Sequence, residues 1–368
     1  MEIRQLKPAE FEQAIQLADD TFREQGHTSM GEAFPHVFSP QLQQSFGAFD
    51  GDRLVSFMGL VPATIQIGEA SLTVYSLGAV CTHEEYRKQG ISTKILKEIY
   101  RYINHAAASL LFVSGDRGMY MRNQCYHFGK TYSYLINKST VNKAGYVGEI
   151  RRGQPADLFQ IDRIKRATQV RFDNSIWEWQ VLLEASGFAS IFKMKQSLYV
   201  ASQDGVIEGY VVMGMPTENS TKEQAIVTEW GGDSKAIYGI LLNLLENDVV
   251  SEIELTIPWH EKLREELSAY PYKEIQNAGT IHIVNAARLI DQLMPYVYDK
   301  NPIVAQNLTV ETLEDDHVIF RYHKESKISL GVDELVALLF DPHGGSAFVA
   351  LQTIFPIPLP HTEGLYFV

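Results

Sequence analysis

One stretch of the sequence combines basic side chains, a glycine and a predicted helix start in the order that an anion-binding site requires. It reads Gly78-Ala-Val-Cys-Thr-His-Glu-Glu-Tyr-Arg-Lys-Gln-Gly-Ile-Ser92. Free backbone N–H groups at a helix start bind phosphate oxygens, and the helix dipole adds to this attraction. Gly90 has no Cβ to block a phosphate, and Arg87, Lys88 and Lys94 add positive charge. The pattern therefore predicts a phosphate-binding loop.

Such a loop must be held between a strand and a helix. Residues 72–80 are rich in β-forming side chains and predict the strand before the loop. Isoleucines recur every fourth residue after the loop and form one apolar stripe of a helix, at Ile91, Ile95, Ile99 and Ile103. Residues 110–114 then predict a short buried strand. This order of elements is typical of a mixed α/β domain.

The chain repeats its own organisation. Residues 3–11 read IRQLKPAEF, and residues 150–158 read IRRGQPADL. Asp50-Gly51 and Asp204-Gly205 each lie between two apolar, strand-like runs, which is a strong hairpin signal. The matching order of strand, proline-opened helix and hairpin predicts two homologous α/β units with the same strand order.

Composition narrows the class of protein. The chain has 45% hydrophobic and 21% charged residues, which is ordinary for a folded globular protein. Its 32 basic and 45 acidic residues give a net charge of −13, which disfavours a nucleic-acid partner. No apolar run is long enough for a membrane span, and the start lacks a signal-peptide core. Two cysteines, Cys81 and Cys125, fit a reducing, cytoplasmic location.

Motifs for several other chemistries are incomplete. The segment from His260 to Arg264 reads HEKLR and lacks the second histidine of a zinc-protease helix. The two cysteines do not form a metal-binding pair, and Walker and Rossmann glycine patterns are missing. His343-Gly-Gly is not accompanied by a nucleophile elbow. We therefore expect no metal.

The strand, loop and helix around Gly90 resemble the GCN5-related N-acetyltransferase (GNAT) superfamily. In that family a Q/R-x-x-G-x-G/A loop binds the pyrophosphate of acetyl-CoA, and Ser92 stands here at the last small position. The resemblance implies that backbone groups of Val80 and Thr82 contact the pantetheine arm. It also implies a pyrophosphate loop made of Arg87, Lys88, Gln89, Gly90, Ile91 and Ser92.

The same resemblance implies a tyrosine that protonates the departing CoA thiolate. Two tyrosines follow the strand at 110–114, namely Tyr120 and Tyr126. Tyr120-Met-Arg122 fits the family's Tyr-x-Arg phrase, although Asn123 and Gln124 replace its Phe-Gly. Tyr126 is followed by His-Phe-Gly but lacks the arginine. Tyr120 is the favoured candidate, and Tyr126 is the alternative.

The whole layout resembles one branch of the superfamily, the bacterial enhanced-intracellular-survival acetyltransferases. That resemblance implies an acetyl-CoA-binding domain at 1–145, a degenerate acetyltransferase-like domain at 146–284 and a sterol-carrier-protein-like domain at 285–368. The second unit has Glu229-Trp-Gly-Gly-Asp-Ser-Lys-Ala236 in place of the phosphate loop, and Asp233 would repel a phosphate. We interpret this second unit as structural. Relatives assemble, so a dimer or hexamer is implied.

The same branch implies a role for the end of the chain. In those proteins the terminal carboxylate reaches the first domain's active site, which here implies Val368 as a proton acceptor. Pro356, Pro358 and Pro360 stiffen the approach to it. We therefore expect the terminus in a cleft between the first and third domains, near Tyr120.

Acceptor contacts are expected from the segment after the first helix. Glu24, Glu32, Phe34 and His36 are the candidates for holding an amine by charge and stacking. The fold class expected is α/β (α+β), with two tandem mixed-sheet domains and a small α+β domain. The function expected is acetyl transfer from acetyl-CoA to a primary amine of a small molecule or peptide. The alternative is a non-catalytic protein that binds acyl-CoA or an apolar ligand.

Overall fold

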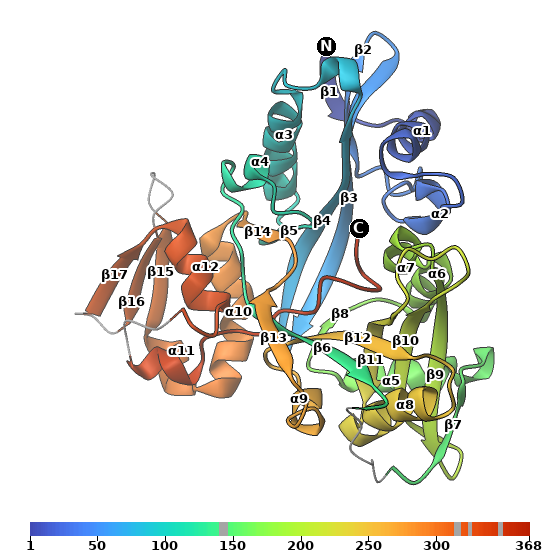
Figure 1. Ribbon diagram of the computed structural model, residues 1–368. Helices are drawn as coiled ribbons and strands as arrows, with labels where there is room; N and C mark the ends of the chain where they lie inside the picture. Colours follow the sequence, from blue (N-terminus) through green and yellow to red (C-terminus); the bar gives the residue numbers. More distant parts are fainter. Residues whose placement is uncertain (140–145, 313–317, 323–325, 345–348) are drawn as a thin grey trace.

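Two mixed β-sheets of equivalent strand order form the framework of the molecule (Figure 1). The computed structural model describes residues 1–139, 146–312, 318–322, 326–344 and 349–368. The first sheet has the order β1-β2-β3-β4-β5-β14, with β8 paired to β3, and the second has the order β13-β6-β12-β11-β10-β9-β7. The strands of the first sheet are β1 (Glu2–Gln5), β2 (Phe46–Asp50), β3 (Arg53–Ile67), β4 (Ala70–Thr82), β5 (Leu110–Val113), β8 (Val170–Phe172) and β14 (Thr280–Ile283). Those of the second are β6 (Lys130–Asn137), β7 (Glu149–Arg152), β9 (Lys195–Gln203), β10 (Val206–Met215), β11 (Ala225–Gly232), β12 (Glu252–Pro258) and β13 (Tyr272–Gln276).

The predicted duplication is confirmed by the strand order. Strands β1-β2-β3-β4-β5 correspond to β7-β9-β10-β11-β12, and the last pair of each set, β4 with β5 and β11 with β12, is parallel. Both predicted hairpins form, between β2 and β3 and between β9 and β10. Asp204 and Gly205 have φ values of 51° and 78°, as a type I′ turn requires.

The two units exchange strands between their sheets. Strand β6 belongs to the first unit in the chain, but it does not extend the first sheet. Strand β6 instead pairs with β12 and β13 in the second sheet. Strands β8 and β14 of the second unit pair with β3 and β5 in the first sheet. The two units are therefore joined by backbone hydrogen bonds as well as by side-chain packing.

Helices cover both faces of each sheet. In the first unit, α1 (Phe11–Phe22) packs on one face and α3 (Ile91–His105) on the other, so that each face has its own apolar core. The predicted isoleucine stripe of α3 is fully buried. The remaining helices of the two units are α2 (Met30–Ala33), α4 (Gly118–Met121), α5 (Leu158–Ala167), α6 (Ile176–Ala185), α7 (Gly187–Ile191), α8 (Ser234–Glu246) and α9 (Leu263–Glu266). Short 3-10 turns are η1 (Pro8–Glu10), η2 (Glu84–Tyr86), η3 (Pro155–Asp157) and η4 (Val349–Thr353).

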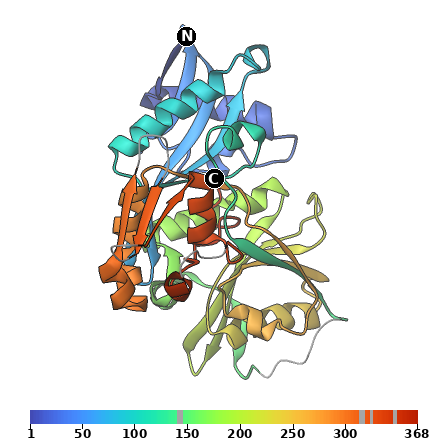
Figure 2. The same cartoon turned by 90° about the vertical axis from the view of Figure 1, so that its left-hand side faces the viewer.

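The third segment is a small α+β unit beside the junction of the other two (Figure 2). Its antiparallel sheet has the order β15-β16-β17. Its elements are α10 (Ala286–Lys300), α11 (Pro302–Asn307), β15 (Leu308–Thr312), β16 (Val318–Tyr322), β17 (Ser326–Leu330) and α12 (Val332–Phe340). Leu289 and Leu293 of α10 share one apolar core with Ile65 and Leu72 of the first sheet. The fold class is therefore the predicted one.

The C-terminal tail, residues 355–368, leaves the third segment and runs back between the first two units (Figure 1). It contains no regular helix or strand, as its prolines predict. The backbone N–H of Ile357 donates to the Leu339 carbonyl at 2.6 Å, and that of Leu365 donates to the Thr228 carbonyl at 3.1 Å. Leu359 and Leu365 are buried. The tail is therefore docked along its length.

Candidate active site

A cavity of about 270 Å³ opens where β4 and β5 separate. The parallel pairing of these strands joins residues 74–77 to residues 110–113, but β4 continues to Thr82. Beyond Leu77 the two strands therefore diverge, and a gap between parallel strands exposes backbone groups that a ligand can use. The cavity is lined by Phe22, Arg23, Met30, Phe34, Ala79, Val80, Ser114, Gly115, Arg117, Tyr120, Ile191, Phe367 and Val368.

Strand β4 carries a bulge at this cavity. Its register against β3 shifts between the pairs Gly59–Gly78 and Phe57–Cys81, so that Ala79 and Val80 stand opposite one residue. Ala79 has a φ of 48°, which is uncommon for a residue with a side chain. A bulge re-aims backbone groups out of the hydrogen-bond ladder. The bulge therefore turns backbone groups near Val80 toward the cavity.

The predicted phosphate loop lies at the end of β4, after η2. Helix α3 begins at Ile91, its N-cap Gly90 has a φ of 72°, and no side chain caps the helix start. Arg87 is exposed and donates from Nε to the Thr82 carbonyl at 3.0 Å, which fixes the guanidinium beside the loop. A Cβ added at Gly90 would meet no heavy atom within 4 Å. The uncapped N–H groups and the open space fit a bound phosphate.

Changes in this loop test its role directly. We expect Arg87→Ala to weaken CoA binding by about 1–2 kcal/mol, the range for one charge-assisted hydrogen bond. Gly90→Val should weaken it further, because valine is strained at a positive φ and places methyl groups at the helix start. Calorimetry with the full chain measures both effects. Lys97→Ala, an exposed change further along α3, is the control, and equal CoA affinity in all four proteins would contradict the loop assignment.

Tyr120 lies at the cavity, and its side chain is 6% exposed. Burial raises the pKa of its hydroxyl to about 12, so it stays protonated at neutral pH. Tyr126 is not among the lining residues. Its backbone pairs with Ile281, with N···O distances of 2.8 and 2.9 Å. The structure therefore brings Tyr120, and not Tyr126, to the point where β4 and β5 separate.

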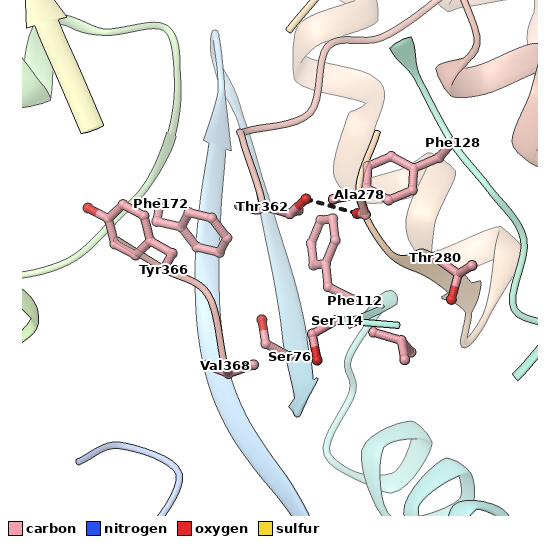
Figure 3. A pocket seen from close by; sticks show the side chains of 11 residues that line it. Ser76, Phe112, Ser114, Phe128, Phe172, Ala278, Thr280, Thr362, Tyr366 and Val368 are labelled. Carbon is pink, nitrogen blue, oxygen red and sulfur yellow. Dashed lines mark hydrogen bonds between the residues drawn. The ribbon is translucent and has the colours of Figure 1, made fainter. Parts of the chain in front are cut away.

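Val368 reaches the same cavity and lies against Gly78 of β4. A Cβ added at Gly78 would stand 2.0 Å from the carboxyl carbon of Val368. Figure 3 shows Val368 beside Ser76 and Ser114, with Thr362 of the tail bonded to the Ala278 carbonyl at 3.1 Å. Further back, the Tyr366 ring stacks on Phe172 with a centroid distance of 4.4 Å. The tail thus presents its last residue to the exposed β4 backbone.

The walls of the cavity differ from the sequence expectation in one respect. We expected a cleft between the first and third domains. The structure instead sets α1 and α2 of the first unit opposite Ile191 of α7 in the second unit. Among the described residues of the third segment, only Phe367 and Val368 at the end of the tail line the cavity. The expectation was wrong because helices α6 and α7 of the second unit cannot be located from the repeat pattern.

The predicted acceptor residues divide into two groups. Phe34 lines the cavity, and its ring lies 6.3 Å from that of Phe367. Glu24, Glu32 and His36 are not lining residues. The exposed Glu24 instead faces Lys193 at 3.9 Å, and burial lowers the pKa of His36. Sequence reasoning missed Arg23 and Arg117, because neither lies in a motif that marks it.

The second unit has no equivalent open site at the start of α8. Asp233 caps that helix, and its carboxylate accepts from the N–H groups of Lys235 and Ala236 at 2.9 and 3.1 Å. These N–H groups correspond to those left free in α3. The β11 bulge at Thr228 is covered by Gly364 and Leu365 of the tail. Both features support the interpretation of this unit as structural.

Within the described residues, no group of three or more His, Cys, Asp or Glu side chains is placed to hold a metal ion. No helix in the described part of the chain has the length and apolar character needed to cross a bilayer.

Comparisons with known proteins place this geometry in a family. Residues 2–126 match the family model described as an acetyltransferase (GNAT) domain. The whole chain resembles a GCN5-related N-acetyltransferase from Anabaena variabilis, with a TM-score of 0.68, 11% identity and 99% of each chain covered. It also resembles a probable N-acyltransferase of unknown function from Enterococcus faecalis, with a TM-score of 0.66, 15% identity and coverage of 90% of this chain and 84% of that one.

A further similar structure is Eis1 from Mycobacterium abscessus, with a TM-score of 0.61, 13% identity and coverage of 91% of this chain and 88% of that one. No curated protein sequence matches the chain. At these identities the structural likenesses show a shared fold, and the family model supplies the assignment. Residues 2–126 are therefore an acetyltransferase (GNAT) domain by this match, and the chain as a whole shares the fold of these N-acetyltransferase structures.

Proposed function

We propose that the protein transfers the acetyl group of acetyl-CoA to a primary amine, by direct attack of the amine on the thioester. One observation carries this proposal. Strand β4 lines a cavity with Tyr120 and Val368 at Ala79 and Val80, and it ends at Thr82, shortly before the uncapped helix start at Gly90. A ligand that carries phosphates at one end and a reactive thioester at the other needs binding groups for both ends along one strand.

The donor would lie along the free backbone of β4. The residues from Arg87 to Ser92 would hold the pyrophosphate, through backbone N–H groups and the Arg87 guanidinium. Val80 and Thr82 would bind the pantetheine amides, because β4 continues past the end of its pairing with β5. The acetyl carbonyl would then reach the bulge at Ala79.

The groups around the bulge would assist each bond that forms or breaks in the transfer. The amine nitrogen bonds to the acetyl carbon, and a backbone N–H near Val80 or Cys81 stabilises the oxyanion of the tetrahedral intermediate. Its collapse breaks the carbon–sulfur bond, and Tyr120 protonates the departing thiolate. The carboxylate of Val368 accepts the proton that the amine loses, directly or through water. Tyr120 regains its proton from solvent.

The location, assembly and partners of the protein are part of the same proposal. We infer a cytoplasmic protein that assembles as a dimer or hexamer, with residues 285–368 as a sterol-carrier-like domain. Its partners would be small-molecule or peptide amines rather than nucleic acid or membrane. The covered bulge and the capped helix of the second unit support a single catalytic site in the first unit.

One experiment separates this function from simple acyl-CoA binding. Acetyl-CoA affinity is measured by calorimetry, and CoA release is measured with polyamines, aminoglycosides, amino acids and peptide amines. Amine-dependent CoA release above the rate of thioester hydrolysis is the expected result. Tight acetyl-CoA binding without release by any amine would favour the non-catalytic alternative.

A further inference from the structure

The charge of the cavity wall differs from the charge of the whole chain. The protein is acidic overall, yet among the described residues no aspartate or glutamate side chain lines this cavity. Its charged side chains are Arg23, which follows α1, and Arg117, which follows β5. The remaining lining side chains on the α1–α2 side are apolar, namely Phe22, Met30 and Phe34. A polycationic acceptor would meet two guanidinium groups here, against the single terminal carboxylate of Val368.

Arg23 is held in place but is not neutralised. Its Nη2 donates to Ser190 Oγ at 3.0 Å, and its guanidinium carbon lies 5.7 Å from the centre of the Phe34 ring. Its Nε is buried and has no hydrogen-bond partner among the described residues. Burial lowers the pKa of this side chain, and within the described residues no carboxylate forms an ion pair with it. A half-buried, unpaired arginine is costly unless a ligand supplies the missing anion.

The acidic side chain that acts on Arg23 through its charge is engaged elsewhere. Burial lowers the pKa of Arg23, and the charge of Asp19 in α1 opposes this effect less strongly. However, its two carboxylate oxygens accept from Ser29 Oγ at 2.8 Å and from the Met30 N–H at 2.6 Å. Asp19 therefore fixes the start of α2 rather than binding Arg23. This leaves the guanidinium available to the cavity.

These observations point to the chemistry of the acceptor. Resting on the transferase function above, we propose that the acceptor is an amine that also carries an oxyanion, a carboxylate or a phosphate, and that Arg23 binds this oxyanion. A guanidinium presents a planar fork of N–H donors that matches either group. The apolar wall suits a hydrophobic body between amine and oxyanion, as in an amino acid with an apolar side chain. Arg117 at the exposed side of the cavity adds attraction for the same charge.

The test compares ligands that differ only in the oxyanion. Binding to the full chain loaded with CoA is measured by calorimetry for L-phenylalanine against L-phenylalaninamide, and for phosphoethanolamine against ethanolamine. Spermidine serves as the polycation. We expect the anionic member of at least one pair to bind about tenfold or more tightly, as one charge-assisted contact allows. The pair that shows the preference identifies the oxyanion.

Two variants separate charge from packing. Arg23→Gln should abolish the preference within the pair, whereas Ser190→Ala, which removes the hydrogen bond and keeps the charge, should retain it. Equal binding within both pairs, tighter binding of the neutral members or of spermidine, or no binding of any probe would overturn the proposal. Loss of the preference in both variants would also overturn it. An anion preference without acetylation would support the oxyanion subsite and refute the proposed acetyl transfer. Acetylation without an anion preference would support the transfer and refute the subsite.

Discussion

Replacing Tyr120 by phenylalanine is expected to lower turnover by about 10²–10⁴-fold, the range for loss of a general acid. The thiolate of CoA is a poor leaving group until it is protonated, and Tyr120 is the buried hydroxyl at the cavity where β4 and β5 separate. Acetyl-CoA affinity should change little, because the phosphate loop and the β4 backbone are untouched. Timed assays of CoA release measure turnover, and calorimetry measures acetyl-CoA affinity separately.

The pH dependence gives a second readout of the same residue. Burial raises the pKa of Tyr120 to about 12, so the hydroxyl keeps its proton through the neutral and mildly alkaline range. Loss of this proton should therefore not reduce turnover until the pH approaches that value. Tyr126→Phe is the matched control. A large loss in that variant, together with near-normal turnover in Tyr120→Phe, would transfer the acid role to Tyr126.

The phosphate loop and the duplication could be predicted because their signals are local. A glycine before a helix, a fixed isoleucine stripe and two Asp-Gly turns report on the conformation of their own neighbourhood. Gly90 has the positive φ that suits a glycine before a helix, and the isoleucine stripe on α3 is buried. Tyr120 could be proposed because the resemblance to the acetyltransferase superfamily implies a tyrosine after the short buried strand at 110–114, which the pattern locates.

Other features depend on contacts that no local pattern encodes. The apolar residues of β6 predict a strand, but the choice of partner between β5 and β12 is made by the tertiary packing. Arg23 lies at the end of an ordinary amphipathic helix, and only its position beside Ser190, far along the chain, places it at the cavity. Glu24 is the adjacent residue and carries the charge that suits an amine, yet it is exposed on the surface.

The tail connects the two units through equivalent points of their sheets. Leu365 binds Thr228 at the bulge of β11, and Val368 lies at Gly78 just before the bulge of β4. The same piece of chain therefore covers the bulge of the unit without a phosphate loop and ends beside the bulge of the unit that has one. This arrangement fixes where Val368 lies, since Leu365, Tyr366 and Phe367 each contact a different part of the molecule.

Removal of Val368 alone is expected to reduce turnover about 10²-fold or more, the effect of losing a proton acceptor. The shortened chain would carry its carboxylate on Phe367, displaced by up to about 3.5 Å. The Phe367 ring itself packs against Phe34 and Phe188 and should stay docked. Acetyl-CoA affinity should remain close to that of the unaltered protein, because the phosphate loop that follows β4 is unchanged. Steady-state kinetics and calorimetry on the two proteins check both expectations.

A substitution in β4 should displace the same carboxylate. Gly78 does not have a positive φ, so alanine is compatible with its backbone, but the new Cβ would stand 2.0 Å from the carboxyl carbon of Val368. Gly78→Ala should therefore displace the end of the tail and reduce turnover as the deletion does. Val368→Ala keeps the carboxylate and loses only the side-chain methyl groups, so it should retain most of the turnover. Equal activity in the deletion and the Val368→Ala variant would exclude the carboxylate from the reaction, because the two differ in where that group lies.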